Sequence, residues 1–185
     1  IGYACVETLA KAGARVYMAC RNLEVGNEKT AALCAQGLDV KTVYFEAYDK
    51  DSILNMIDTV VANEGRIDIL VNNFGGTKPY DDKTIFDTDY DDFARYVEVH
   101  MSTVFRASQA AITKAMAAQQ SGAIINIGSV AGLTPDVSQL AYGTSKAGII
   151  HLSKMIASQA AALNITCNVV CPGMTATAAV KNHPP

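Results

Sequence analysis

The chain has 185 residues, of which 50% are hydrophobic and 18% are charged, and its formal net charge at pH 7 is -3. This length is enough for one domain with a hydrophobic core, and the composition is that of an ordinary globular protein. Because the charge is slightly negative and no basic run occurs, we expect no nucleic-acid binding. No apolar stretch is long enough to span a membrane, so we expect no membrane partner.

The five cysteines are scattered in apolar surroundings, and their odd number fits no disulfide framework. Reduced thiols of this kind, without a secretory signal, are typical of cytoplasmic proteins. No cysteine and histidine residues have the spacing of a zinc site, so we expect no metal. The chain opens at Ile1 without a methionine and stops at Pro185 without a final element. We therefore expect both ends of the chain to be cut.

Hydrophobic periodicity and turn residues predict an alternation of helices and strands. The predicted helices are 2–12, 23–36, 51–63, 90–118 and 139–163, and the predicted strands are 15–20, 40–47, 67–72, 123–127 and 165–171. The helix at 90–118 is long enough to be broken in the middle. Short connections and strands rich in Val and Ile predict βαβ units, a parallel sheet and right-handed crossovers. We expect a single, incomplete domain over residues 1–185.

An acidic segment lies between the third predicted strand and the fourth predicted helix. Its carboxylates are Asp81, Asp82, Asp87, Asp89, Asp91 and Asp92. They would suit a metal ion, but a solvated loop with carboxylates at the N-terminus of a helix explains them more simply.

Ligands bind beyond the carboxyl ends of the strands in an open α/β sheet, and the sequence has suitable residues at these points. Gly2 begins the first helix, whose free N–H groups suit a phosphate. Arg21 follows the strand at 15–20, where dinucleotide-binding folds meet the adenosine ribose. An acidic residue there would favour NAD, whereas the cation of Arg21 suits the 2′-phosphate of NADP. An arginine that merely ends a surface strand is the alternative.

Three later strand ends have the same character. Residues 72–76 (NNFGG) follow one strand, and their glycines let the backbone approach a ligand closely. Ser129 follows the strand at 123–127, and Pro172-Gly173 follows the last strand. Because polar residues collect at these ends while the strand interiors stay apolar, the pattern favours a binding or catalytic protein over a structural one.

Tyr142 and Lys146 are four residues apart in a predicted helix, so their side chains lie on one face of it. A lysine cation beside a phenol favours the phenolate, which suits the pair to proton transfer near neutral pH. The same spacing also occurs by chance on surface helices. Ser129, thirteen residues before Tyr142, favours the catalytic interpretation.

Together these motifs resemble those of the short-chain dehydrogenase/reductase family, in order and spacing, along essentially the whole chain. The matching features are Ile1-Gly2 as the end of a TGxxxGIG loop, NNFG at 72–75, Ser129, YGTSK at 142–146, and Pro172-Gly173 with Thr177. The resemblance implies a Rossmann-like, doubly wound parallel sheet with helices on both faces, of which the first and last strands are missing from this chain. Within the family the chain most resembles bacterial, clostridial-type 7α-hydroxysteroid dehydrogenases, through the segments RIDILVNNFGG, PDVSQLAYGTSKAGI and NITCNVVCPGMTAT.

The resemblance implies a hydride transfer between NADP and the C7 hydroxyl or ketone of a bile acid. Tyr142 would exchange a proton with the substrate oxygen. Lys146 would favour the ionised phenol and hydrogen-bond the nicotinamide ribose. Ser129 would hydrogen-bond the substrate oxygen and hold it near Tyr142. The hydride chemistry itself belongs to the cofactor.

The resemblance also implies an NADP site. Thr175 and Thr177 match the positions that hold the carboxamide, and Glu46 with Ala47 match those beside the adenine. Asn73, Phe74 and Gly75 would lie along the cofactor ribose. The expected cofactor-binding residues are Ile1, Gly2, Arg21, Glu46, Ala47, Asn73, Phe74, Gly75, Tyr142, Lys146, Pro172, Gly173, Thr175 and Thr177.

His100 departs from the family pattern, which usually places an asparagine at this point of a bent helix. The main-chain carbonyl of that residue is thought to hold a water in the proton relay to the lysine. A backbone role survives the change, but a bulkier imidazole could disturb the bend. Asp68, Asn72 and Asn126 are expected to brace the sheet instead of binding a ligand.

Two alternatives stay open from the sequence. One is a general carbonyl or 3-oxoacyl reductase on the same scaffold. The other, from a different class, is a non-catalytic NADP-binding or interaction protein. The helices at 90–118 and 139–163 resemble the subunit-pairing helices of the family, which implies a dimer or tetramer, although their apolar faces would also serve only to cover the sheet.

Overall fold

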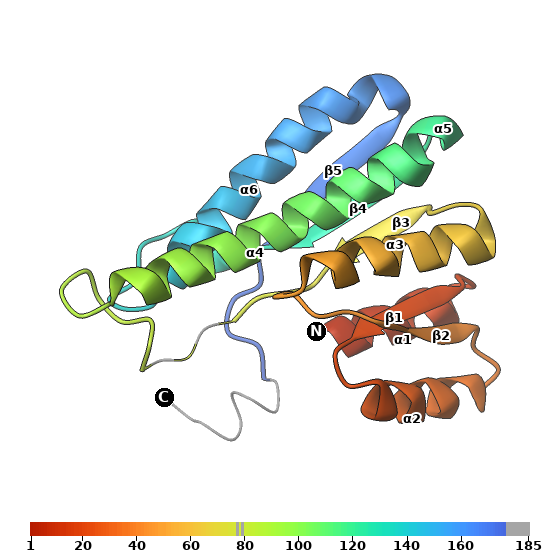
Figure 1. Ribbon diagram of the computed structural model, residues 1–185, viewed down its shortest axis with the longest axis horizontal. Helices are drawn as coiled ribbons and strands as arrows, with labels where there is room; N and C mark the ends of the chain where they lie inside the picture. Colours follow the sequence, from red (N-terminus) through yellow and green to blue (C-terminus); the bar gives the residue numbers. More distant parts are fainter. Residues whose placement is uncertain (77, 79, 177–185) are drawn as a thin grey trace. The chain divides into compact units, whose positions relative to one another are not determined.

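A computed structural model of the chain describes residues 1–76, 78 and 80–176 (Figure 1). The residues divide into two units, Ile1–Gly65 and Arg66–Pro185. Unit 1 contains α1 (Gly2–Lys11), β1 (Val16–Cys20), α2 (Leu23–Cys34), β2 (Val40–Tyr44) and α3 (Lys50–Glu64). Unit 2 contains β3 (Ile69–Asn72), α4 (Tyr90–Ala111), a π-helical turn (Ile112–Met116), α5 (Ala117–Gln119), β4 (Gly122–Ile127), a 3-10 turn (Val130–Gly132), α6 (Leu140–Ala160), a second 3-10 turn (Ala161–Leu163) and β5 (Ile165–Val170).

In unit 1, β1 and β2 form a parallel pair in which Val16 lies opposite Val40. The strands and helices share a small apolar core. Its buried members are Ala10, Met18, Leu33 and Val40. Side chains cap two of the helices, since Asn22 accepts from the backbone of α2 and Asp49 from that of α3.

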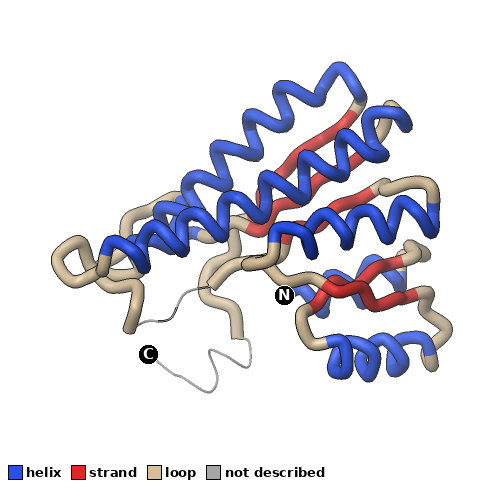
Figure 2. The backbone as a smooth tube through the Cα atoms, viewed as in Figure 1, coloured by secondary structure: helices blue, strands red, loops and turns tan. Residues whose placement is uncertain are grey.

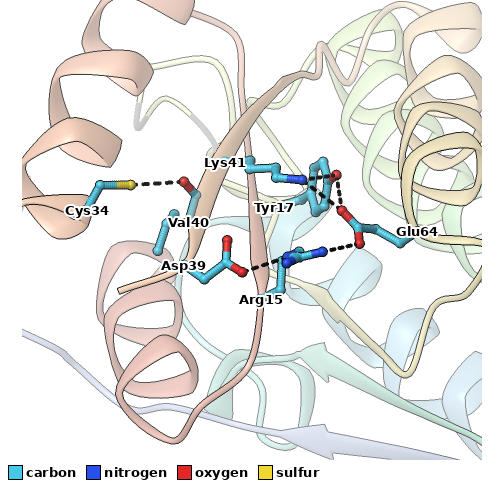
Figure 3. A network of polar contacts seen from close by, with 7 residues as sticks. All are labelled: Arg15, Tyr17, Cys34, Asp39, Val40, Lys41 and Glu64. Carbon is cyan, nitrogen blue, oxygen red and sulfur yellow. Dashed lines mark hydrogen bonds and ion pairs between the residues drawn. The ribbon is translucent and has the colours of Figure 1, made fainter. Parts of the chain in front are cut away.

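A polar cluster joins the strands of unit 1 to the end of α3 (Figure 3). Arg15 contacts Asp39 at 2.6 Å and Glu64 at 2.5 Å. Tyr17 donates to Glu64 at 2.7 Å, and Lys41 donates to the same carboxylate at 2.8 Å. The hydrogen bonds from Lys41, Tyr17 and Arg15, in this order of size, lower the pKa of Glu64 to about 2. This cluster therefore keeps its carboxylate ionised over almost the whole pH range.

In unit 2, three parallel strands lie in the order β3-β4-β5 (Figure 2). Helices α4 and α6 run side by side along this sheet (Figure 1). Buried amides brace it: Asn72 donates to Asn126 at 2.8 Å across β3 and β4, and Asn126 donates to Ser153 of α6 at 2.7 Å. These two asparagines therefore have the expected bracing role. Asp68, in contrast, pairs with Arg66 at the surface.

The predicted elements are all present, with shifted ends. The helix expected at 90–118 is interrupted by the π-helical turn Ile112–Met116, and α6 ends in a 3-10 turn. Strand β2 ends at Tyr44, three residues earlier than expected. Among the described strands, β1 pairs only with β2 and β3 only with β4. Within the described residues, no helix combines the length and the apolar character needed to cross a membrane.

Candidate active site

Lys146 lies on α6, one turn after Tyr142, and is 2% exposed. Its ammonium donates to the carbonyl of Ile127 at the end of β4, at 2.8 Å, and to the carbonyl of Phe74 after β3, at 3.2 Å. The same nitrogen lies 5.6 Å from the ring centroid of Tyr142, which is half-buried. Burial lowers the pKa of Lys146 to about 8. The helix therefore presents a phenol beside an ammonium that exchanges its proton near physiological pH.

Gly75 makes this arrangement sterically possible. Its φ is +131°, a region that residues with a side chain rarely adopt. A Cβ at this position would lie only 3.0 Å from Nζ of Lys146. The segment after β3 therefore reaches the ammonium because it carries a glycine there.

Ser129 lies two residues after the end of β4 and is the N-cap of the 3-10 turn Val130–Gly132. Its Oγ accepts a hydrogen bond from the backbone of Ala131 at 3.2 Å, which leaves the hydroxyl proton for another acceptor. A Cβ on Gly132 would lie 2.7 Å from the backbone of Lys146. This glycine therefore lets the turn after Ser129 pack directly on α6, beside the residues of the site.

His100 lies on α4 and is 2% exposed. Its Nε2 is 3.1 Å from the carbonyl oxygen of Gly76, and its ring packs edge-on against Phe74 and Tyr142, at centroid distances of 5.6 and 6.2 Å. Its Nδ1 is buried and has no hydrogen-bond partner among the described residues. Burial, and then the charge of Lys146, lower the pKa of His100 to about 4, so the imidazole is neutral at pH 7.

The imidazole of His100 does not break the helix that carries it. Helix α4 runs without interruption from Tyr90 to Ala111, and the only helical irregularity between Tyr90 and Gln119 is the π-helical turn that begins at Ile112. The ring is accommodated by packing between the segment after β3 and α6.

Asp82 is 1% exposed, a burial that the sequence pattern does not predict. Its two carboxylate oxygens accept the backbone N–H groups of Ala141 and Tyr142, at 2.7 and 2.9 Å. The interpretation of the acidic segment as a solvated loop is correct for exposed Asp87 and for Asp89, which caps α4, and wrong for Asp82. The burial of Asp82 depends on a tertiary contact with residues 59 and 60 positions later in the chain, so it becomes apparent only in the structure.

The end of β5 lies beside the turn that follows Ser129. The carbonyl of Pro172 accepts the N–H of Val130 at 3.1 Å. Gly173 and Thr175 follow in the exposed segment, where the hydroxyl of Thr175 donates to the carbonyl of Gly173 at 3.1 Å. Asn73 is exposed on the segment after β3. Thr177 lies outside the described residues.

The remaining predicted cofactor residues lie in unit 1. Nε of Arg21 is 3.7 Å from a carboxylate oxygen of Glu46, and the arginine side chain is 77% exposed. Ala47 next to Glu46 is buried. Ile1 precedes α1, whose first turn has neither a side-chain cap nor an acidic residue, so its N–H groups are suited to an anion. The structure therefore brings Arg21 and Glu46 together at the carboxyl ends of β1 and β2.

Comparisons with known proteins show the family and the fold of the chain. The family model for short chain dehydrogenase matches residues 1–185. A 7α-hydroxysteroid dehydrogenase of Clostridium sardiniense is 43% identical over 183 residues, which cover 98% of this chain and 70% of that protein. A 3-oxoacyl-acyl-carrier-protein reductase of Salmonella typhimurium is 36% identical over 177 residues, covering 96% and 70%. The crystal structure of a gluconate 5-dehydrogenase from Burkholderia cenocepacia in complex with NADP and tartrate superposes with a TM-score of 0.87 at 27% identity, covering 96% and 68%. These matches confirm the predicted doubly wound α/β fold.

Proposed function

Since the chain belongs to the short-chain dehydrogenase/reductase family of oxidoreductases, we propose that it transfers a hydride between NADP and the C7 hydroxyl or ketone of a bile acid. The observation that carries the chemistry is the buried ammonium of Lys146 beside the phenol of Tyr142. The observation that supports the substrate is the 43% identity to a 7α-hydroxysteroid dehydrogenase.

The described residues fit a nicotinamide cofactor. Lys146 donates to two carbonyls in the described part of the chain, and a third N–H of its ammonium is left for a ribose hydroxyl. Gly75 adds no side chain that would crowd this ammonium. Arg21 offers an exposed guanidinium to a 2′-phosphate, and Glu46 holds it from the side. We propose that the full predicted set, from Ile1 and Gly2 to Thr175 and Thr177, belongs to one domain and binds NADP. The cofactor would supply or accept the hydride.

The side chains of unit 2 would handle the proton. In the reductive direction Tyr142 donates its phenolic proton to the substrate oxygen as that oxygen becomes a hydroxyl, and in the oxidative direction it takes the proton back. The ammonium of Lys146 stabilises the phenolate that remains. Ser129 directs its free hydroxyl proton at the same oxygen and fixes its place. The imidazole of His100 stays neutral and packs edge-on against the rings of Phe74 and Tyr142.

A substrate panel tests the proposed activity. We expect the protein to oxidise 7α-hydroxy bile acids with NADP and to reduce the matching 7-ketones with NADPH, and Tyr142→Phe to abolish both. Unchanged turnover in Tyr142→Phe would remove the catalytic assignment of Tyr142, whereas a wild type that binds NADP without any turnover would favour the non-catalytic alternative.

The alternative activity is that of a 3-oxoacyl or general carbonyl reductase, which the 36% identity to the Salmonella typhimurium enzyme favours. The same panel separates the two. Turnover of 3-oxoacyl thioesters or small ketones without turnover of bile acids would overturn the steroid assignment and keep the family chemistry.

A change of charge tests the choice of cofactor. Arg21→Asp removes the cation proposed for the 2′-phosphate, so we expect it to raise KM for NADPH much more than KM for NADH. Arg66→Asp is the matched control, because Arg66 is an exposed arginine that pairs with Asp68. An equal loss of both cofactors in Arg21→Asp would discredit the role of Arg21.

We also propose that the protein is a cytoplasmic homodimer or homotetramer that pairs through α4 and α6. These helices expose Phe105 and Met155, which are 47% and 45% accessible. Burying such side chains stabilises an interface. Light scattering of the wild type and of a Phe105→Lys, Met155→Lys variant tests this proposal, and a wild-type monomer would overturn it.

A further inference from the structure

The start of α6 is capped by a residue from a distant segment. Gln139, which precedes the helix, has a φ of +60° and makes no capping hydrogen bond with its side chain. The two oxygens of Asp82 instead accept the N–H groups of Ala141 and Tyr142, the second and third residues of the helix. A carboxylate in this place satisfies two donors that the helix itself leaves without partners.

We propose that Asp82 is a positioning residue that holds Tyr142 in place for proton transfer, an inference that rests on the proposed function. One of its two hydrogen bonds goes to the backbone N–H of Tyr142 itself, at 2.9 Å. Because this bond fixes the backbone from which the phenol extends, the hydroxyl can move only by rotation about its side-chain torsions. The ring edge is in turn held against His100, at a centroid distance of 6.2 Å.

Asp82 is itself tied to α4. Its backbone N–H donates to the carbonyl of Lys78 at 3.0 Å. The hydroxyl of Tyr96, on α4, accepts the N–H of Lys78 at 3.3 Å and donates to Asp81 at 3.1 Å. The carbonyl of Lys83 accepts the N–H at the start of α6, from Leu140, at 3.2 Å. Residues 78 and 80–83 thus join the helix that carries His100 to the helix that carries Tyr142.

The contact places the carboxyl group of Asp82 at the N-terminus of a long helix. A negative charge is stabilised at the N-terminus of a long helix, and hydrogen bonds from N–H groups to a carboxylate are stronger than those between neutral groups. The charge of Asp82 also acts on the site, since it is among the smaller influences that raise the pKa of His100. Asp82 is 1% exposed, so water cannot replace either hydrogen bond without a change in the packing.

Kinetics of Asp82→Asn, Asp82→Ala and Asp87→Asn test this role. The amide of Asp82→Asn keeps one acceptor oxygen, so this variant retains part of the cap if Asp82→Ala does not fold. Asp87→Asn is the matched control, because Asp87 is exposed in the same loop. A displacement of the reacting group by about 1 Å costs on the order of 100-fold in rate. We therefore expect kcat of the Asp82 variants to fall about 10- to 100-fold with little change in KM for NADPH.

Two further readouts separate positioning from a loss of stability. The primary isotope effect with 4-deuterated NADPH should increase in Asp82→Asn, because the chemical step becomes slower relative to cofactor binding and release. Hydrogen exchange of the Ala141 and Tyr142 amides should accelerate, while amides further along α6 stay protected. A purely structural role would lower the melting temperature and leave kcat and the isotope effect of the folded enzyme unchanged.

The outcomes distinguish this inference from the proposed function. Wild-type turnover that depends on Tyr142, together with an unchanged kcat in Asp82→Asn, would overturn the positioning role alone. Unchanged exchange at Ala141 and Tyr142 would overturn the contact itself. A wild type without turnover of any carbonyl substrate would overturn the proposed function, and the positioning role with it.

Discussion

The polar cluster around Glu64 in unit 1 and the buried Lys146 in unit 2 hold their charges in opposite ways. In unit 1, Arg15 and Lys41 lie at the surface against Asp39 and Glu64, so each charge has an opposite partner (Figure 3). In unit 2, Lys146 is buried, and its hydrogen-bond partners in the described part of the chain are carbonyl oxygens. Pairing raises the pKa values of Arg15 and Lys41 and lowers that of Glu64, whereas burial lowers that of Lys146.

Under the proposed function, the cluster around Glu64 serves stability and the site around Lys146 serves chemistry. Paired surface charges keep one protonation state across the physiological pH range. A buried cation without a carboxylate has a pKa close to physiological pH, which is the property that proton transfer requires. Substitutions at Lys146 should therefore act mainly on activity and substitutions at Glu64 mainly on stability. The expected effects decrease from Lys146 through His100 to Glu64.

The largest effect is expected from Lys146→Met. Without the ammonium the phenolate of Tyr142 loses its stabilising charge, so we expect kcat to fall by about 10²- to 10⁴-fold, the usual contribution of acid–base catalysis. Lys154→Met, at an exposed position of the same helix, is the control and should keep its activity. Steady-state kinetics with NADPH and a ketone measure both. A loss of less than about tenfold would place Lys146 outside the chemistry.

The second effect is a dependence of stability on pH that comes from Lys146. Its pKa is 10.5 when unfolded and about 8 when folded, so the unfolded chain binds more protons between these values. The free energy of unfolding should therefore rise from pH 8 to pH 10.5, with a contribution of about 3 kcal/mol from this residue. Urea unfolding at several pH values measures it. The same rise in Lys146→Met would show that other groups cause it.

His100 should produce a similar effect on the acidic side. Its pKa falls from 6.5 to about 4 on folding, so its contribution to stability is present above pH 6.5 and is lost as the pH falls to 4. We expect His100→Asn to remove up to about 3 kcal/mol of this acid sensitivity. His151→Asn, at an exposed position of α6, is the control.

The kinetic consequence of His100→Asn separates packing from catalysis. A neutral imidazole that only fills space has no part in the proton transfer, so turnover should be kept or raised. A large loss of turnover in a variant that folds would instead show that His100 has a role of its own.

How much of this molecule the sequence predicts depends on the range of the contact. Local patterns predict the strands and the helices, although the interruption at Ile112 lies nearer the end of the long helix than its middle. The fixed spacing of Ser129, Tyr142 and Lys146 predicts the candidate site. The burial of Asp82 was not predictable, because an acidic loop has the same sequence pattern whether or not one of its carboxylates contacts a distant helix. The cluster around Glu64 was not predicted for the same reason, because its members come from β1, β2 and α3, which are separate in the sequence.

The smallest effect is expected from Glu64→Gln, which removes the shared acceptor of the unit 1 cluster. The pKa of Glu64 is lowered on folding from 4.5 to about 2, so its contribution to stability is present above pH 4.5 and is lost as the pH falls through 2. Because the interactions lie at the surface and salt screens them, we expect a decrease of only a few degrees in melting temperature, which should become smaller in high salt and below pH 4. Activity per folded molecule should be unchanged, since the cluster takes no part in the proposed proton transfer. Loss of activity in Glu64→Gln at full stability would break the division between a stabilising cluster in unit 1 and a reactive one in unit 2.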